Sequence, residues 1–345
     1  MSEISRRQFL LRAGGAAYGI PLGAALISMP QPGRAAGTVS ISEQVDWTVS
    51  NRIMGEVVAK ALGYFEEEGI DLSIILGGPN IDGVASVASG RAAVGLLSSS
   101  PSLMLARAGG IPIKCVAAGF QQHPFTYFSL PTNPIRTPED FRGKRVGTSQ
   151  TSVILLRALL KKNNIPEDQV KVVVIGPDVA PLLTGQVDAV TNWATDATPL
   201  KPLGPDRVEL RLWDCGVRLY ANPFYATETT LKERPDVVAA FIRATARGWG
   251  YVKANPEKAV ELFVKAYPVR DREAELASVG LALSYVFTKE TAQSGWGAMQ
   301  KEVWAEQLQM YDELGQFANR SVPKLDDIVT VDILKSTESA RPKLS

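Results

Sequence analysis

Short β-branched runs alternate with stretches of helical periodicity from Gly37 to Val190. Short apolar runs predict strands at 39–41, 72–76, 94–97, 125–130, 145–148, 172–175 and 187–190. Between these runs, apolar residues at helical spacing predict helices at 53–62, 81–88, 153–162 and 178–185, with a further helix beginning at Pro101. The alternation of the two patterns is typical of α/β layers.

Two segments of the chain repeat one physical pattern. Residues 88–94 and 183–190 each run from the end of a helix through a glycine into a short apolar strand. Each strand then opens into a polar loop, at 98–100 in the first segment and at 192–196 in the second. Ligands bind at the carboxyl ends of strands in open α/β sheets. We therefore expect one lobe architecture built twice, with a cleft between the two loops.

The last third of the chain differs from the rest. Long helical periodicities occur at 237–253, 256–267, 273–285 and 298–314. We expect this helical block to return and pack on the first lobe. The chain then crosses between the lobes near 121–125 and 220–225, and a pair of short crossings is the geometry of a hinge. These crossings predict lobe one at 37–123 and 225–345, and lobe two at 124–224.

The first 36 residues have the features of an export signal rather than of a folded domain. Arg6 and Arg7 precede an apolar, glycine-rich stretch at 11–29, and small residues up to Ala36 form the pattern of a cleavage site. This arrangement resembles a twin-arginine signal, which a receptor reads as an address. An uncleaved membrane helix is the alternative, which the glycine content disfavours. We expect a cleaved signal at 1–36 and a soluble mature protein in the periplasm, without a lipid anchor.

Composition and charge exclude several classes of protein. The net charge is +1 and no run of Lys or Arg interrupts the chain, so nucleic acid is not an expected partner. Two cysteines cannot form a disulfide framework. Cys115 lies in an apolar run and fits a buried free thiol, while a single bridge to Cys215 is left open. One histidine excludes a His-rich metal site, and no metal, cofactor or catalytic residue is expected.

The candidate pocket has an aromatic wall and a hydroxyl-rich wall. Aromatic rings that can sandwich a flat ligand stand at loop positions, namely Trp47, Phe125, Trp193, Tyr220 and Tyr225. Core or interface packing is the alternative for each ring. Segments 98–100 and 149–152 precede predicted helices, where hydroxyls and free N–H groups can hold a carbonyl or an oxyanion. Simple N-capping is the alternative for these hydroxyls.

Further polar side chains complete the candidate site. Asn192 and Asp196 flank Trp193 and can hydrogen-bond ring nitrogens or an exocyclic amine. Asp46 can do the same or orient its loop. His123 lies in a crossing segment, as a ligand contact or as a structural residue. The full set of expected ligand-binding residues is Asp46, Trp47, Asn51, Ser98, Ser99, Ser100, His123, Phe125, Ser149, Thr151, Ser152, Asn192, Trp193, Asp196, Tyr220 and Tyr225.

Several motifs of the chain resemble those of a known family. They lie at 61–72 (ALGYFEEEGIDL), 90–100, 105–113, 138–147 (PEDFRGKRVG) and 183–189 (LTGQVDA). In order and spacing they are similar to the periplasmic binding proteins of nitrate, sulfonate, taurine and thiamine-pyrimidine uptake. The resemblance implies a type-II fold of two lobes, each a mixed sheet flanked by helices. It also implies the solute-binding component of an ABC importer rather than an enzyme. The implied partners are a small-molecule ligand and a permease with its cytoplasmic ATPase, and we expect a monomer.

The ligand class rests on weaker signals than the family does. Asp46-Trp47 and the crossing at 121–125 favour the pyrimidine-precursor branch of that family. The loops chosen as pocket walls contain no arginine, which a site for a fully charged anion recruits, although Arg52 and Arg91 are near in sequence. We therefore expect a small, flat heteroaromatic ligand similar to a pyrimidine precursor of thiamine. A sulfonate, taurine, nitrate or an aromatic carboxylate is the alternative. A pyridoxal-phosphate-dependent pyrimidine synthase is a remote alternative, because the export signal contradicts a cytoplasmic location.

Overall fold

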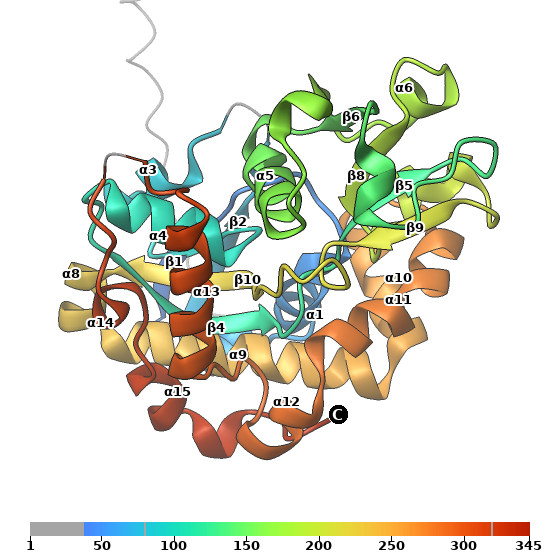
Figure 1. Cartoon of the computed structure of the whole chain (residues 1–345). Coiled ribbons are helices and arrows are strands. Elements are labelled where there is room, and N and C mark those ends of the chain that lie inside the picture. Colours follow the sequence, from blue (N-terminus) through green and yellow to red (C-terminus); the bar gives the residue numbers. More distant parts are fainter. Residues whose placement is uncertain (1–37, 79–80, 319) are drawn as a thin grey trace, which may run out of the picture. The chain divides into compact units, whose positions relative to one another are not determined.

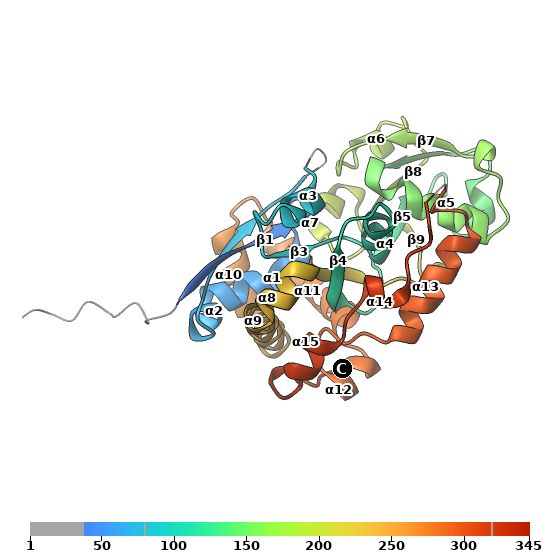
Figure 2. The ribbon, with the colours of Figure 1, turned by 90° about the vertical axis from the view of Figure 1, so that its left-hand side faces the viewer.

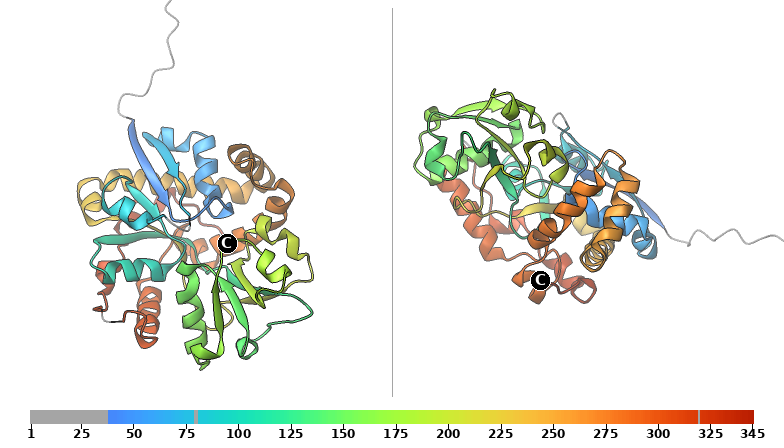
Figure 3. Two further views of the ribbon diagram at one scale, coloured as in Figure 1. Left: turned by 90° about the horizontal axis from the view of Figure 1, so that it is seen from above. Right: turned by 90° about the vertical axis from the view of Figure 1, so that its right-hand side faces the viewer.

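The computed structural model describes residues 38–78, 81–318 and 320–345 (Figure 1). The expected export signal at 1–36 lies outside these residues. Ten strands form two sheets of five strands each within the described chain. In Figures 2 and 3 the green elements of the second sheet gather together, apart from the blue strands of the first sheet. Among the described residues, no helix combines the length and the apolarity needed to cross a membrane.

The first sheet has the strand order β2-β1-β3-β10-β4. Its strands are β1 (Val39–Val45), β2 (Ile70–Ile75), β3 (Val94–Leu96), β4 (Ile113–Phe120) and β10 (Ala221–Thr227). Strand β1 pairs in parallel with β2 and β3, whereas β10 is antiparallel to both β3 and β4. The polar loops that follow β1 and β3 therefore leave the sheet at the same edge.

The second sheet has the order β7-β6-β8-β5-β9 and repeats this topology. Its strands are β5 (Phe125–Ser129), β6 (Arg145–Thr148), β7 (Lys171–Val174), β8 (Ala189–Trp193) and β9 (Val208–Arg211). Strand β6 is parallel to β7 and β8, and β5 is antiparallel to β8 and β9. The chain passes from β4 of the first sheet to β5 of the second, and later returns from β9 to β10. Both β5 and β10 hold the fourth position in the order of their sheet. This confirms the expected two-lobed α/β fold, while the exact lobe bounds stay a prediction.

Helices cover both sheets. The helices before the second crossing are α1 (Met54–Ala61), α2 (Tyr64–Glu67), α3 (Gly83–Ala88), α4 (Ser100–Ala108), α5 (Val153–Lys162), α6 (Ala180–Leu183) and α7 (Ala197–Leu200). The later helices are α8 (Glu228–Glu233), α9 (Pro235–Ala254), α10 (Pro256–Ala266), α11 (Arg272–Val286), α12 (Lys289–Ser294), α13 (Lys301–Glu313), α14 (Leu325–Ile328) and α15 (Asp332–Ser336). As expected, the C-terminal helices pack mainly on lobe one: α9 on α1, α13 on α4, and α14 and α15 on β4.

Helices α1 and α9 approach each other backbone to backbone. A Cβ atom at Gly248 would lie 2.0 Å from the carbonyl oxygen of Gly55, and one at Gly55 would lie 2.2 Å from the side chain of Trp249. Only glycine at both positions permits this crossing. Trp249 is buried in the same contact. The close crossing fixes α1, and with it the short turn before α1 that carries Arg52.

The two cysteines are separate. Cys115 lies on β4 and Cys215 follows β9, and both are buried and free. The bridge that the sequence left open is not formed in this structure, and the interpretation of Cys115 as a buried free thiol is confirmed.

Candidate ligand-binding site

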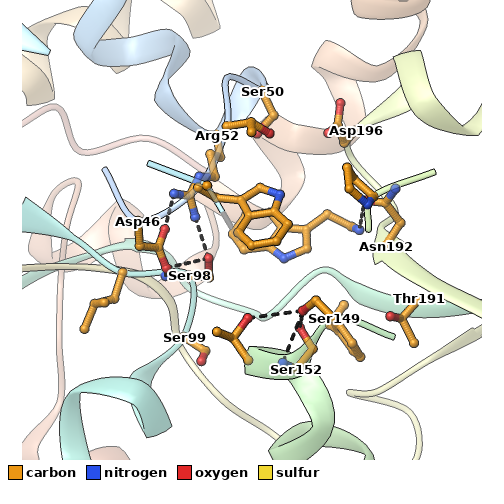
Figure 4. A pocket seen from close by; sticks show the side chains of 18 of the residues that line it. Asp46, Ser50, Arg52, Ser98, Ser99, Ser149, Ser152, Thr191, Asn192 and Asp196 are labelled. Carbon is orange, nitrogen blue, oxygen red and sulfur yellow. Dashed lines mark hydrogen bonds and ion pairs between the residues drawn. The ribbon is translucent and has the colours of Figure 1, made fainter. Parts of the chain in front are cut away.

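A cavity of about 790 Å³ lies between the two lobes. Its walls come from the segment after β1, the start of α4, the turn before α5 and the end of β8. Figure 4 shows Asp46, Arg52 and Ser98 on one side of the cavity, with Asn192 and Asp196 opposite them. Both loops that follow the repeated helix–glycine–strand pattern therefore line the cavity, as the sequence predicts.

Twelve of the expected ligand-binding residues line this cavity. They are Asp46, Trp47, Ser98, Ser99, His123, Phe125, Ser149, Thr151, Ser152, Asn192, Trp193 and Asp196. Both lobes contribute, as closure around a ligand requires. The cavity places these residues together, and their contact with a ligand stays a prediction.

Four expected residues are not among those that line the cavity: Asn51, Ser100, Tyr220 and Tyr225. The Ser100 hydroxyl donates to Oε1 of Gln307 at 2.6 Å, and the Tyr220 hydroxyl accepts from the Gln300 N–H at 3.3 Å. Tyr225 is fully buried on β10, opposite Gly95. The packing alternative therefore fits Tyr220 and Tyr225. The side chains of Ser100 and Asn51 are engaged within the protein, since the Asn51 amide donates to the carbonyl oxygen of Thr195 across the lobes.

An ion pair lies at the lobe-one wall of the cavity. The Asp46 carboxylate pairs with Arg52, and its Oδ2 accepts from the Ser98 N–H at 2.7 Å and from the Ser98 hydroxyl at 2.8 Å. Nη1 of Arg52 donates to the same hydroxyl at 2.8 Å. Asp46 thus orients its own loop and fixes Ser98, one of the two roles open to it from the sequence.

Arg52 also reaches the opposite lobe. Its guanidinium carbon lies 5.6 Å from the ring centroid of Trp193, which is a cation–π geometry. The Trp193 ring further contacts Phe120, with centroids 5.5 Å apart, and His123, with centroids 5.4 Å apart. These contacts set the plane of the indole at the cavity wall, where a half-buried ring can stack on a ligand.

His123 is buried at the crossing between the lobes. Its Nδ1 accepts a hydrogen bond from the Phe125 N–H at 3.2 Å, which places the proton of the neutral ring on Nε2. Burial lowers the pKa of His123 to about 3, and the nearby charge of Arg52 adds to this effect. Within the described chain Nε2–H has no hydrogen-bond partner. His123 therefore has a structural role and also lines the cavity as a neutral ring.

A second arginine lines the cavity and was not expected. Arg270 pairs with Asp196 of lobe two, and its Nε and Nη2 contact Oε1 of Glu275 at 2.8 and 2.6 Å. Its Nη1 donates to the carbonyl oxygen of Val49 at 3.2 Å. Burial raises the pKa of Asp196, and the Arg270 charge acts in the opposite direction.

The loops chosen as pocket walls contain no arginine, but two arginines from other segments of the chain complete the walls of the cavity. Both Arg52 and Arg270 line the cavity, but each is already paired with a carboxylate. The described lining also contains four aspartates, Asp46, Asp82, Asp178 and Asp196. Acidic groups thus outnumber the basic groups around the cavity, which makes it a poor site for an anion.

The hydroxyls before α5 partly serve the backbone. Ser149 Oγ accepts from the N–H of Ser152 at 3.2 Å, which is an N-cap contact. The same hydroxyl lies 3.1 Å from the hydroxyl of Thr151 and 2.8 Å from that of Ser152. The capping interpretation therefore holds for Ser149, and all three residues still line the cavity.

Two buried acids lie in lobe one, close enough to Arg52 to feel its charge. Glu43 on β1 and Glu56 on α1 are fully buried, and none of their carboxylate oxygens has a hydrogen-bond partner in the described chain. Burial raises the pKa of Glu56 from 4.5 to about 8, against the lowering effect of the nearby Arg52 charge. Burial and the neighbouring Glu56 also raise the pKa of Glu43.

The raised pKa of Glu56 predicts pH-dependent stability. A carboxyl group whose pKa is higher in the folded state stabilises the fold most below its ordinary value of 4.5, and that contribution is lost as the pH rises through about 8. Glu56→Gln keeps the site neutral at every pH. We expect the variant to melt a few degrees above the wild type at pH 8.5 and close to it at pH 5, by calorimetry. Glu66→Gln, at an exposed position, should change neither value.

The amino-acid sequence of the chain is similar to those of a known protein family. A family model described as NMT1/THI5 like matches residues 50–259. The chain is 28% identical to the riboflavin-binding protein RibY of Chloroflexus aurantiacus over 261 residues, which cover 72% of this chain and 73% of the relative. It is 25% identical to the formylaminopyrimidine-binding protein of Halalkalibacterium halodurans over 283 residues, which cover 79% of this chain and 84% of the relative.

A further relative is named as an enzyme. The 4-amino-5-hydroxymethyl-2-methylpyrimidine phosphate synthase of Legionella pneumophila is 28% identical over 219 residues, which cover 61% of this chain and 69% of the relative. Among solved structures, the periplasmic aliphatic sulphonate binding protein SsuA from Escherichia coli matches with a TM-score of 0.64 at 17% identity, covering 89% of this chain and 94% of that structure. The likeness shows that this chain has the periplasmic binding protein fold.

Proposed function

We propose that this chain, which belongs to the NMT1/THI5 like family, is the solute-binding component of an ABC importer. In this role it captures a neutral, flat heteroaromatic solute by closure of its two lobes. The observation that carries the proposal is the cavity between two sheets of equal topology, walled by Trp193 and by hydrogen-bonding groups from both lobes. Groups from both lobes allow a ligand to stabilise the closed form.

The charge of the cavity supports a neutral ligand. Both arginines in the wall are already paired with carboxylates, and the aspartates exceed them in number. A sulfonate, nitrate or carboxylate would meet this acidic surface without a free guanidinium. The relatives named for riboflavin and formylaminopyrimidine binding point to flat nitrogen heterocycles as the class. A pyrimidine precursor of thiamine remains the finer proposal within that class.

A synthase activity is the second candidate, because one relative carries that name. An enzyme that uses pyridoxal phosphate needs a lysine that forms a Schiff base with the cofactor. None of the described residues that line the cavity is a lysine or a cysteine. The lining of the cavity therefore favours a binding protein over a pyridoxal-phosphate-dependent enzyme.

Localisation and partners follow from the proposed role. The twin-arginine pattern at 6–7 supports export to the periplasm, with removal of residues 1–36. There a monomeric binding protein in its closed form would dock on a permease, with the ATPase on the cytoplasmic side. A permease gene and an ATPase gene beside the gene for this chain would support this assignment.

Trp193→Ala tests the proposed site. Loss of the stacking surface should weaken ligand binding by about 1–3 kcal/mol while the fold is kept. Isothermal titration with riboflavin and with 4-amino-5-hydroxymethyl-2-methylpyrimidine gives the affinities. Trp213→Ala is the matched control, because Trp213 is half-buried but not among the residues that line the cavity. An unchanged affinity in the Trp193 variant would remove this residue from the site.

A further inference from the structure

Three charged side chains join the lobes at one end of the cavity. Asp196 follows β8 of the second sheet. Arg270 lies just before α11 and Glu275 in its first turn, and α11 packs on α10 of lobe one. Arg270 and Glu275 are buried, and the Asp196 side chain is 16% exposed toward the cavity. We call these three residues the closure triad.

Other contacts across the lobes surround the closure triad. The Thr198 hydroxyl donates to Oε1 of Glu275 at 3.1 Å, and Nζ of Lys201 pairs with Asp271 at 2.8 Å. The Asn51 amide of lobe one donates to the carbonyl oxygen of Thr195. The segment 195–201 of lobe two is therefore held to lobe one at several points, and each contact requires the lobes to be together.

The contacts of Arg270 differ in the lobe to which each partner belongs. Glu275 and the carbonyl oxygen of Val49 both belong to lobe one, so they stay with Arg270 if the lobes separate. Of the Arg270 contacts within the described chain, only the one with Asp196 crosses to lobe two. Breaking a buried ion pair is costly when one charge is left unpaired. Here Arg270 keeps Glu275, and Asp196 turns toward water, so the cross-lobe contact can break reversibly.

We propose that Arg270 is a positioning residue that acts through Asp196. When the lobes are shut, Arg270 draws Asp196 into the cavity wall, so the polar wall of the site is complete only in the closed form. The same contact holds the lobes together in the absence of ligand. This goes beyond the proposed function, because it concerns the ligand-free protein and does not depend on the ligand's identity.

Solution scattering of the purified, ligand-free protein tests the proposal. We expect the wild-type profile to match the structure with its lobes together, and Asp196→Asn and Arg270→Gln to give a larger radius of gyration. The closed-to-open ratio should fall about tenfold or more in each variant, as expected for the loss of a charge-assisted hydrogen bond. Arg272→Gln is the matched control, because Arg272 pairs with Glu261 on the exposed surface of lobe one and should leave the profile unchanged.

The outcomes separate this proposal from the proposed function. A wild type that is open without ligand, or variants that scatter like the wild type while circular dichroism shows them folded, would overturn the role of Arg270. If Arg270→Gln fails to fold, Asp196→Asn and Thr198→Val decide the question, since both positions are only partly buried. A failure to bind any heteroaromatic compound would count against the proposed function and would leave the scattering result standing.

Discussion

Replacing Arg52 by alanine is expected to lower the free energy of unfolding by about 3 kcal/mol. The change leaves the Asp46 carboxylate without its cation and removes the charge above the Trp193 ring. The loss lies at the lower end for a broken buried pair, because Asp46 keeps two hydrogen bonds from Ser98 and its side chain is 19% exposed. Urea denaturation followed by circular dichroism measures this value.

Arg91→Ala is the matched control for Arg52, because Arg91 belongs to the same lobe and is exposed. It should change the free energy of unfolding by less than about 0.5 kcal/mol. A loss below about 1 kcal/mol for Arg52→Ala would mean that Asp46 is hydrated well enough to need no counter-charge.

Gly248→Ala should destabilise the protein by about 2–3 kcal/mol. The new methyl group would lie 2.0 Å from a backbone oxygen of α1, which no side-chain rotation can relieve, so α1 and α9 must move apart. Gly280→Ala is the control within a helix, because nothing lies within 4 Å of a Cβ atom there and the position is exposed. The control should stabilise the protein by up to about 1 kcal/mol through helix propensity. Equal thermal shifts for the two variants would contradict the close crossing of α1 and α9.

The architecture was largely predictable because it depends on local patterns. The helix–glycine–strand repeat at 88–94 and 183–190 reports the carboxyl end of a strand in each lobe, and both loops that follow line the cavity. Strand β4 was not predicted as a strand. Its segment Ala117-Ala118-Gly119 has low strand propensity, and pairing with β10, far along the chain, decides its conformation.

The site residues were predictable only where polar or aromatic residues lie in loops at the ends of predicted strands. Arg270 follows a helix in a segment with no local signal, and it reaches the cavity through the packing of α10 and α11. Arg52 had a usable signal, since it lies six residues after Asp46, in the short helical turn Asn51–Ile53. Tyr225 was expected at a loop position, but it lies within β10, and the missing side chain of Gly95 makes room for its ring inside lobe one.

The order of strands in the first sheet has a consequence for biosynthesis. The second sheet takes all five of its strands from one continuous stretch, Phe125 to Arg211, so it can form as soon as that stretch is available. The first sheet places β10, which starts at Ala221, between β3 and β4. Its hydrogen-bonded ladder stays interrupted until the polypeptide beyond lobe two has been made, and pairings between distant residues form slowly. Lobe one, although translated first, is therefore the later of the two to mature.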